Sequence, residues 1–119
     1  MTGLEAAKRR RTASPNDPSL LIMTSLTSGP KHGYGLFQDI ESFAGQRLGP
    51  GTLYGAIARL EERGLIEAML PEGRTRPYRL TAAGEQWLQS MLRDMRSVVE
   101  TATARLAQQP PLTATARLA

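Results

Sequence analysis

The sequence predicts a mainly α-helical fold with one small β-hairpin, in which three short helices precede the hairpin and one long helix follows it. Apolar residues recur at helical spacing through three short segments. The pattern then changes to two short runs around a Pro-Glu-Gly turn, which is typical of a hairpin. An unbroken heptad pattern follows. Two helices joined by a short turn and followed by a hairpin form a winged helix-turn-helix.

The first helix is expected to begin at Asp17 and Pro18, because Asp favours the N-cap and Pro fits the first turn. The stretch that follows is apolar nearly all round, so this helix should be buried on more than one side. Its apolar residues are Leu20, Leu21, Ile22, Met23 and Leu26. The Ser-Gly-Pro segment at 28–30 ends it.

The next two helices are predicted from the glycines at their ends and from the spacing of their apolar residues. One follows His32 and ends at Gly45, a frequent residue after a helix C-terminus. Its apolar positions are Leu36, Phe37, Ile40, Phe43 and Ala44. The other opens with Gly49 and Pro50 and closes at Gly64. Its buried stripe falls at i, i+4 and i+7, at Leu53, Ile57 and Leu60.

Residues 65–70 and 74–80 are the predicted strands of the hairpin, and Thr81 is the expected cap of the last helix. The apolar positions of that helix are spaced 4, 3, 4, 3 and 4 residues apart, at Leu88, Leu92, Met95, Val99, Ala102 and Leu106. So small a domain cannot cover so long a stripe, so a second copy of the chain is the expected partner. The alternative is that this helix packs only on its own first helix.

Four segments follow from this pattern. Residues 1–16 are predicted to be a flexible basic N-terminal arm, and residues 17–81 the winged helix-turn-helix. Residues 82–107 are the predicted C-terminal dimerisation helix, and residues 108–119 a flexible tail after two prolines that break the helix. The sequence TATARLA occurs twice, at 101–107 and 113–119, and no function follows from that repeat.

The composition excludes several classes of protein. The chain has 119 residues, enough for one domain, and it has no cysteine for a disulfide, a nucleophile or a metal site. His32 is the sole histidine, and the 49–51 glycine segment lacks the lysine of a phosphate-binding loop, so we predict no enzyme activity, cofactor or metal. No apolar run approaches the roughly 20 residues of a membrane span, and no secretory signal is evident. A cytoplasmic protein without a membrane partner is expected.

Charge and exposed residues together indicate double-stranded DNA as a partner. The net charge is +4, and 13 of the 15 basic residues are arginine, which suits phosphates and base edges. With the apolar stripe of the third helix buried, its outward face carries Gly51, Gly55, Ala58, Arg59 and Glu62, flanked by Thr52 and Tyr54. Because glycines read no bases, DNA shape should carry much of the specificity. Arg74, Arg76 and Arg79 of the hairpin are predicted to contact phosphates or a narrow minor groove.

Several motifs resemble the PadR family of transcriptional regulators over roughly residues 18–100. They are HGYGL at 32–36, GPGTLY at 49–54, RLE at 59–61, GLI at 64–66 and YRLTAAG at 78–84. The short C-terminal region resembles the subfamily with a single dimerisation helix. The resemblance implies a homodimer that binds an operator, usually represses, and responds to small aromatic or drug-like effectors.

The resemblance also assigns roles to individual residues. By position, Tyr34, Thr52, Tyr54 and the wing arginines correspond to DNA contacts. The outward face of the third helix, and not the resemblance, adds Arg59 as a base reader, with Thr52 and Glu62 as the other candidates. Effector binding is assigned to Trp87, Met91 and Met95. The heptad spacing assigns dimerisation to Leu88, Leu92, Met95, Val99 and Leu106. Packing alone is the competing interpretation of the tryptophan and the methionines. Two positions depart from the family pattern: Gly55 should loosen the third helix, and Pro77 should shorten the wing.

Two other functions fit the same sequence. A winged helix can serve protein contact instead of DNA binding, and a different winged-helix regulator family would share the fold and the DNA role. The salt dependence of DNA binding distinguishes the first of these, because each neutralised phosphate contributes roughly 0.9 to the log–log slope.

Overall fold

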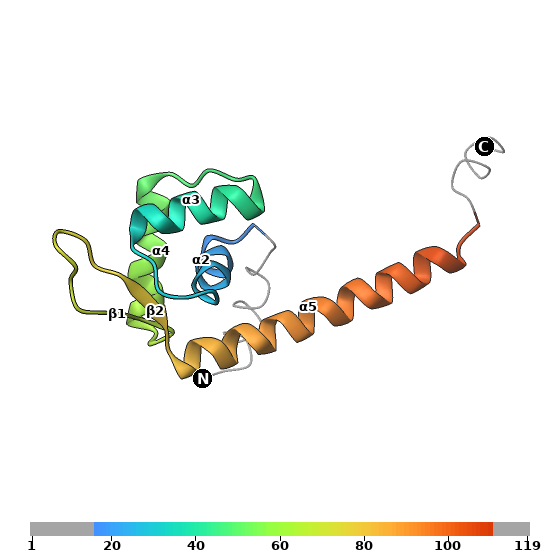
Figure 1. Ribbon diagram of the computed structural model, residues 1–119. Helices are drawn as coiled ribbons and strands as arrows, with labels where there is room; N and C mark the ends of the chain where they lie inside the picture. Colours follow the sequence, from blue (N-terminus) through green and yellow to red (C-terminus); the bar gives the residue numbers. More distant parts are fainter. Residues whose placement is uncertain (1–15, 111–119) are drawn as a thin grey trace. The chain divides into compact units, whose positions relative to one another are not determined.

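The computed structural model describes residues 16–110, in which four helices and a two-stranded antiparallel hairpin occur (Figure 1). In chain order they are α2 (Pro18–Leu26), α3 (Gly33–Ala44), α4 (Pro50–Glu62), β1 (Ile66–Ala68), β2 (Tyr78–Leu80) and α5 (Ala82–Gln108). The predicted fold class is confirmed. The basic run of the predicted arm and the second TATARLA copy lie outside the described residues. The chain divides into two compact units, Met1–Gln89 and Ser90–Ala119, and their boundary falls within α5.

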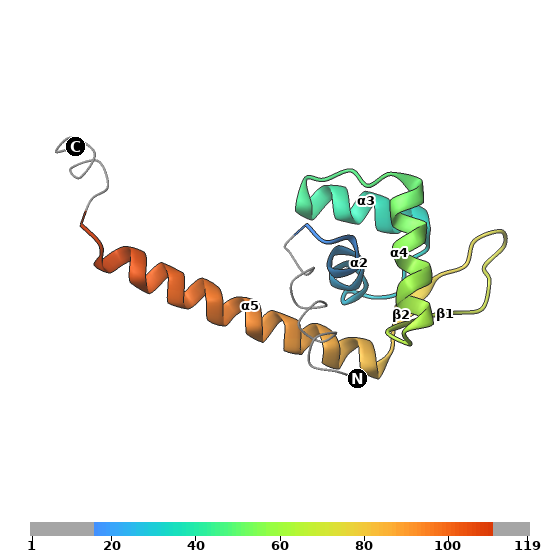
Figure 2. The ribbon, with the colours of Figure 1, turned by 180° about the vertical axis from the view of Figure 1, so that it is seen from behind.

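Helix α2 forms the centre of the first unit, where it contacts α3, α4 and β2 (Figure 2). Ile22 and Met23 are completely buried, and all five of its predicted apolar positions belong to the core. The prediction that this helix is buried on more than one side is therefore confirmed. Asp17 does occupy the N-cap, but its side chain makes no capping hydrogen bond.

Helices α3 and α4 begin and end where their sequence punctuation predicts. His32 is the N-cap of α3, and its Nδ1 accepts a hydrogen bond from the backbone N–H of Gly35 at 3.4 Å. Gly45 ends α3 with φ of 64°, a conformation that favours glycine. Helix α4 buries its predicted stripe of Leu53, Ile57 and Leu60. In α3, by contrast, Phe43 in the last turn is exposed, so the apolar spacing overestimated the buried face there.

The wing is shorter than the apolar runs indicated, with strands of three residues instead of six and seven. Ile66 faces Leu80 at its base. One more backbone hydrogen bond follows, from Met69 N–H to the carbonyl oxygen of Pro77, at 2.8 Å. Proline has no N–H to donate, so Pro77 cannot complete the ladder on its own arm, as its position in the sequence predicted.

Lys31 attaches the wing to the helices. Its backbone N–H donates to the carbonyl oxygen of Tyr78 at 3.1 Å, and its carbonyl accepts from the Tyr78 N–H at 2.9 Å, which adds a short third arm to the sheet. Its Nζ donates to the Ser25 carbonyl and to Ser28 Oγ, and lies 3.9 Å from Asp39 Oδ2. The Ser25 hydroxyl, itself buried, donates to the same Asp39 oxygen at 2.6 Å. One lysine thus connects α2, α3 and β2.

Helix α5 begins at a polar cap and continues through both units. The Thr81 hydroxyl accepts from Gly84 N–H at 3.0 Å and donates to the Gly64 carbonyl at 2.6 Å, which confirms the predicted cap. The helix ends at Gln108, one residue beyond the predicted end. In the second unit its apolar side chains Val98, Val99 and Leu106 are exposed. No helix within residues 16–110 combines the length and the apolar character that a membrane crossing requires.

Candidate nucleic-acid interface

The outward face of α4 has the composition that the sequence predicted. Thr52, Ala58 and Arg59 are exposed together with Gly51 and Glu62. Gly55 is only half-exposed, because the Arg59 Nη1 atom lies 3.5 Å from the position that a Gly55 Cβ would occupy. The guanidinium therefore folds back along the helix over the glycine. Because Gly55 has no side chain, the Arg59 side chain can lie flat against the helix there. It must extend away from the helix to reach a base.

Tyr54 connects α4 to the start of α3. A Cβ at Gly33 would overlap the Tyr54 hydroxyl, so the ring packs directly on the Gly33 backbone. The ring also meets Phe37 edge to face, with centroids 6.3 Å apart and planes at 76°. Half of Tyr54 remains exposed, and Tyr34 on α3 is exposed as well. Tyr54 therefore fixes the angle between the two helices besides presenting its outer edge to a ligand.

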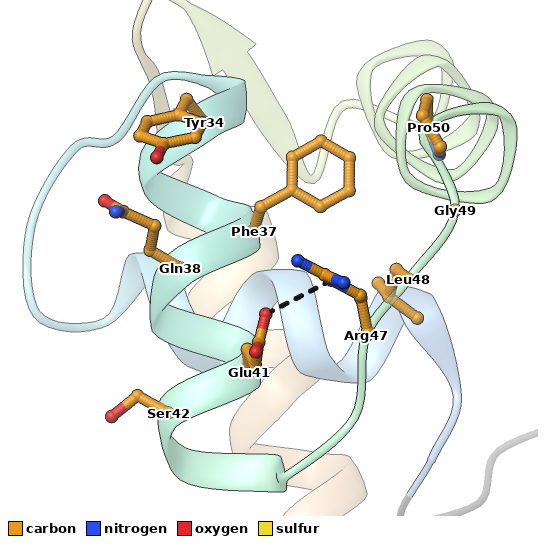
Figure 3. A pocket seen from close by; sticks show the side chains of 9 residues that line it. All are labelled: Tyr34, Phe37, Gln38, Glu41, Ser42, Arg47, Leu48, Gly49 and Pro50. Carbon is orange, nitrogen blue, oxygen red and sulfur yellow. Dashed lines mark ion pairs between the residues drawn. The ribbon is translucent and has the colours of Figure 1, made fainter.

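A hollow of about 1000 Å³ lies between α3 and the turn that leads into α4 (Figure 3). Phe37, Leu48 and Pro50 supply apolar wall, and Tyr34 closes the end near the start of α3. The other lining residues are Gln38, Glu41, Ser42, Arg47 and Gly49. The hollow therefore adjoins the N-terminus of α4, where free backbone N–H groups and the helix dipole favour an anion.

Arg47 is a candidate site residue that the sequence interpretation did not name. It lies in the turn before α4, and its Nε is 3.6 Å from Glu41 Oε2 across the hollow (Figure 3). The Arg47 side chain is 85% exposed, so this ion pair contributes at most about 1 kcal/mol. A basic residue directly before a helix N-terminus was the available signal. An exposed arginine in so weak a pair can exchange its carboxylate for a phosphate.

Replacing Glu41 with glutamine is expected to raise DNA affinity about threefold, because the change frees Arg47 and removes a negative charge from the interface. Arg47→Ala should lower affinity by a similar factor and reduce the salt slope by about 0.9. Fluorescence anisotropy with a labelled duplex at several salt concentrations measures both changes. Unchanged affinity and slope in both variants would remove Arg47 from the interface.

The wing offers fewer free cations than its sequence suggested. Arg74 and Arg76 are exposed near the tip. Arg79, however, pairs with Glu67 on the neighbouring strand, with Nη2 and Nε both 2.6 Å from Glu67 Oε1. Burial raises the pKa of the neighbouring Tyr78 hydroxyl above its ordinary value of 10.0, and the nearby Glu61 carboxylate raises it further. That hydroxyl is therefore protonated, and available as a donor, at neutral pH.

The predicted effector residues are spaced four apart on α5. Trp87, in the first unit, is half-buried, and the Arg63 guanidinium carbon lies 5.4 Å from its ring centroid, a cation–π contact. Met91 and Met95, in the second unit, are partly exposed. Leu88, predicted to belong to the dimerisation seam, is only 4% exposed and instead belongs to the core of its own unit. The other residues of the predicted dimerisation seam are exposed or partly exposed to solvent. They are Leu92, Met95, Val99 and Leu106.

A metal site does not form among the described residues, because no three His, Cys, Asp or Glu side chains come together between 16 and 110. The imidazole of His32 has a structural role, since its Nδ1 caps α3. The chemistry of the site is thus that of hydrogen-bond donors, arginines and small residues around a helix N-terminus.

Three curated proteins resemble this chain in sequence, including the following two. An uncharacterized 37.1 kDa protein in transposon TN4556 of Streptomyces fradiae is 47% identical over 74 residues, which is 62% of this chain and 21% of that protein. Transcriptional regulator YqjI of Escherichia coli is 29% identical over 105 residues, 87% of this chain and 51% of YqjI. The chain therefore spans about a fifth of the first relative and about half of the second.

Solved structures share the fold. A PadR-like transcription factor from Bacteroides fragilis matches with a TM-score of 0.66 and 21% identity, over 87% of this chain and 98% of that one. A transcriptional regulator from Clostridium thermocellum matches with a TM-score of 0.65 and 24% identity, over 72% and 89%.

The family assignment rests on the helices and the wing described above. Residues 22–90, more than half of the chain, match the transcriptional regulator PadR-like family. This family comprises transcriptional regulators, which are not enzymes, so the predicted absence of a catalytic role is confirmed. The chain belongs to the PadR-like family of transcriptional regulators.

Proposed function

We propose that this protein binds a double-stranded DNA operator in a sequence-specific manner, as a homodimer, and represses transcription until an effector binds. The observation that carries the DNA role is the N-terminal end of α4. There a hollow, an exposed arginine and unpaired helix N–H groups adjoin a face of small residues. Tyr34, Thr52, Tyr54, Arg59, Arg74 and Arg76 are the proposed DNA contacts. A regulator acting on DNA would work in the cytoplasm.

The proposed residues differ in the kind of DNA contact that their side chains allow. Gly51 and Ala58 allow the backbone of α4 to approach the major groove closely, whereas Thr52 and Arg59 can hydrogen-bond to base edges or phosphates. With so few base readers on α4, the wing arginines and the spacing of two half-sites must supply much of the discrimination. Helices α4 of two copies would then enter successive major grooves.

Homodimerisation is proposed through the exposed apolar seam of α5. Val99 is 61% exposed in the single chain, and Leu106 and Leu92 are similarly open. These residues continue one heptad stripe, so a second α5 can cover them all at once. Residues 82–107 are therefore proposed as the dimerisation helix, and residues 17–81 as the DNA-binding part.

The effector is proposed to be a small aromatic or drug-like molecule that contacts Trp87, Met91 and Met95. A half-buried indole and two partly exposed, flexible methionines suit a planar apolar ligand. The name and match of YqjI support transcriptional regulation alone, so repression and the ligand rest on the family resemblance. Quenching of fluorescence from Trp87, the single tryptophan, on titration with planar aromatic compounds tests the ligand directly.

Arg76→Ala is expected to weaken DNA binding about fivefold and to lower the salt slope by about 0.9, because one phosphate contact with its counterion release is lost. Arg79→Ala is the matched control: the guanidinium of Arg79 is already held by Glu67, so its loss should change the slope much less. Anisotropy titrations with the duplex upstream of the protein's own gene, and with an unrelated duplex, measure both. Equal slopes for wild type and Arg76→Ala would remove the wing from the interface.

The same titrations distinguish DNA binding from protein contact. Tight binding that prefers the upstream duplex supports an autoregulating operator-binding protein. Absence of binding to either duplex at low salt would overturn the DNA role and favour a winged helix that contacts another protein.

A further inference from the structure

The wing contains a break in its pairing. Just beyond the two short strands, toward the tip of the wing, the Met69 N–H donates a hydrogen bond to the Pro77 carbonyl oxygen. At the tip, Glu72 and Thr75 form an isolated antiparallel pair, with N–H to carbonyl distances of 2.7 and 3.1 Å. Between these two pairs, residues 70–71 of the outgoing arm stand opposite a single residue of the returning arm, Arg76. Two residues against one constitute a β-bulge.

The bulge presents an apolar side chain to solvent. Strand alternation would place residue 70 on the same face as Ile66, which is buried in the core. Leu70 itself is 87% exposed, the highest value among the exposed large apolar residues between 16 and 110. Pro71 has no N–H with which to continue the ladder between Met69 and the Glu72–Thr75 pair. Bulges commonly change the direction of a side chain at such a position.

Arginine side chains line the same part of the wing as Leu70. Together with Met69 and Pro71, Leu70 lines a shallow hollow of about 530 Å³ on the wing, and Arg76 and Arg79 of the returning arm line the same hollow. Glu67 holds Arg79, so Arg76 is the arginine of this hollow that the Glu67 pair leaves for a phosphate. An apolar surface beside such an arginine matches a minor-groove wall, in which sugar faces alternate with phosphates.

The tip beyond the bulge is preformed. Two backbone hydrogen bonds join Glu72 and Thr75, and the Thr75 hydroxyl donates to the Glu72 carbonyl at 2.9 Å. Gly73 takes the positive φ of 61° that the turn requires. Binding would therefore cost little ordering of the tip, which lets one apolar contact contribute measurably.

We propose that Leu70 enters the minor groove of bound DNA and packs against a deoxyribose, while Arg76 contacts the adjoining phosphate. This inference rests on the proposed DNA-binding function and assigns the wing an apolar contact besides its charges. Leu and Pro side chains are among those that proteins insert into the minor groove beside arginines.

The test compares affinity, salt slope and hydroxyl-radical footprints of the full-length protein on its upstream duplex. Leu70→Ala is expected to weaken binding about tenfold with an unchanged salt slope, because it removes apolar burial and no charge. It should also lose protection of the sugars beneath the wing, and Leu70→Met should restore most of both. Phe43→Ala, an exposed apolar truncation on α3, is the matched control and should leave affinity and footprint as in wild type.

Three results are distinguishable. A wild-type protein that binds with a steep salt slope, and a Leu70→Ala variant with the same affinity and footprint, would overturn the role of Leu70 and leave the DNA function intact. Failure of the wild type to bind would overturn both. Loss of affinity accompanied by a shallower slope would show that the substitution displaced Arg76, which also contradicts a direct apolar contact. Because Leu70 is exposed, its truncation should leave the thermal midpoint unchanged.

Discussion

Replacing Gly84 with alanine is expected to lower the free energy of unfolding by about 3 kcal/mol, the upper range of overpacking effects. Gly84 lies in the first turn of α5 and packs on the backbone of Leu65. A Cβ there would overlap the Leu65 carbonyl oxygen and lie 3.2 Å from Leu80 Cδ2. The carbonyl cannot move away freely, because it accepts a hydrogen bond from Thr81 N–H at 3.1 Å.

The measurement is urea unfolding followed by circular dichroism, with Gly51→Ala as the matched control. Gly51 also lies in the first turn of a helix, but nothing lies within 4 Å of the position of its Cβ. Alanine there should leave stability unchanged or raise it by about 0.5 kcal/mol through helix propensity. If both variants were equally stable, the close contact between α5 and the base of the wing would not be a constraint on folding.

The helices of the first unit that precede the wing could be predicted because local signals and burial agree in them. In α4 a Gly-Pro start, an apolar stripe and a terminal glycine all indicate the same element, and its stripe is buried. Burial was predicted less well for residues near the end of a helix or a unit, because it depends there on how far the neighbouring elements reach. Phe43 continues the spacing of α3 but lies in its last turn, beyond what the neighbouring helices cover. Leu88 continues the seam of α5 but lies within the core of the first unit.

The charged part of the candidate site was less predictable. The pairing of Arg79 with Glu67 depends on strand register, and register follows from turn geometry that a bulge alters. Arg47 and Glu41 are brought together by the left-handed turn at Gly45, which spacing alone does not specify. The surroundings of these two arginines therefore could not be predicted from the sequence. Arg79, assigned to DNA, also has a protein partner in Glu67, and Arg47, which was left unassigned, lines the hollow beside α4.

The effect of Gly84 on stability is a further property that the sequence alone does not predict. A glycine inside a helix normally costs stability relative to alanine. Here its cost is offset by the close approach of α5 to the Leu65 carbonyl, a contact between segments about twenty residues apart in sequence. Propensity favours alanine at this position, whereas the tertiary contact forbids it. Only the structure shows which of the two effects is larger.

If the protein pairs through α5 as proposed, the double substitution of Leu92 and Val99 by glutamate is expected to leave it monomeric. It should also weaken operator binding about a hundredfold, because the second half-site then loses the advantage of effective concentration. Both side chains are exposed in the single chain, so the cost to its own unfolding free energy should be small. Apposed glutamates in a coiled-coil seam would repel each other and leave their charges poorly solvated. Analytical ultracentrifugation gives the oligomeric state, and anisotropy gives the affinity for a two-half-site duplex.

Ser97→Glu serves as the control for placing a glutamate on α5, because helical spacing places residue 97 on the side of α5 opposite the 92–99 seam. It should remain dimeric and bind as wild type does. A double variant that stayed dimeric would show that the two copies pair through another surface. A monomeric variant with undiminished affinity would show that a single winged helix suffices for DNA binding. The two readouts separate the pairing of α5 from the chemistry of α4 and the wing, since the substituted residues lie outside the first unit.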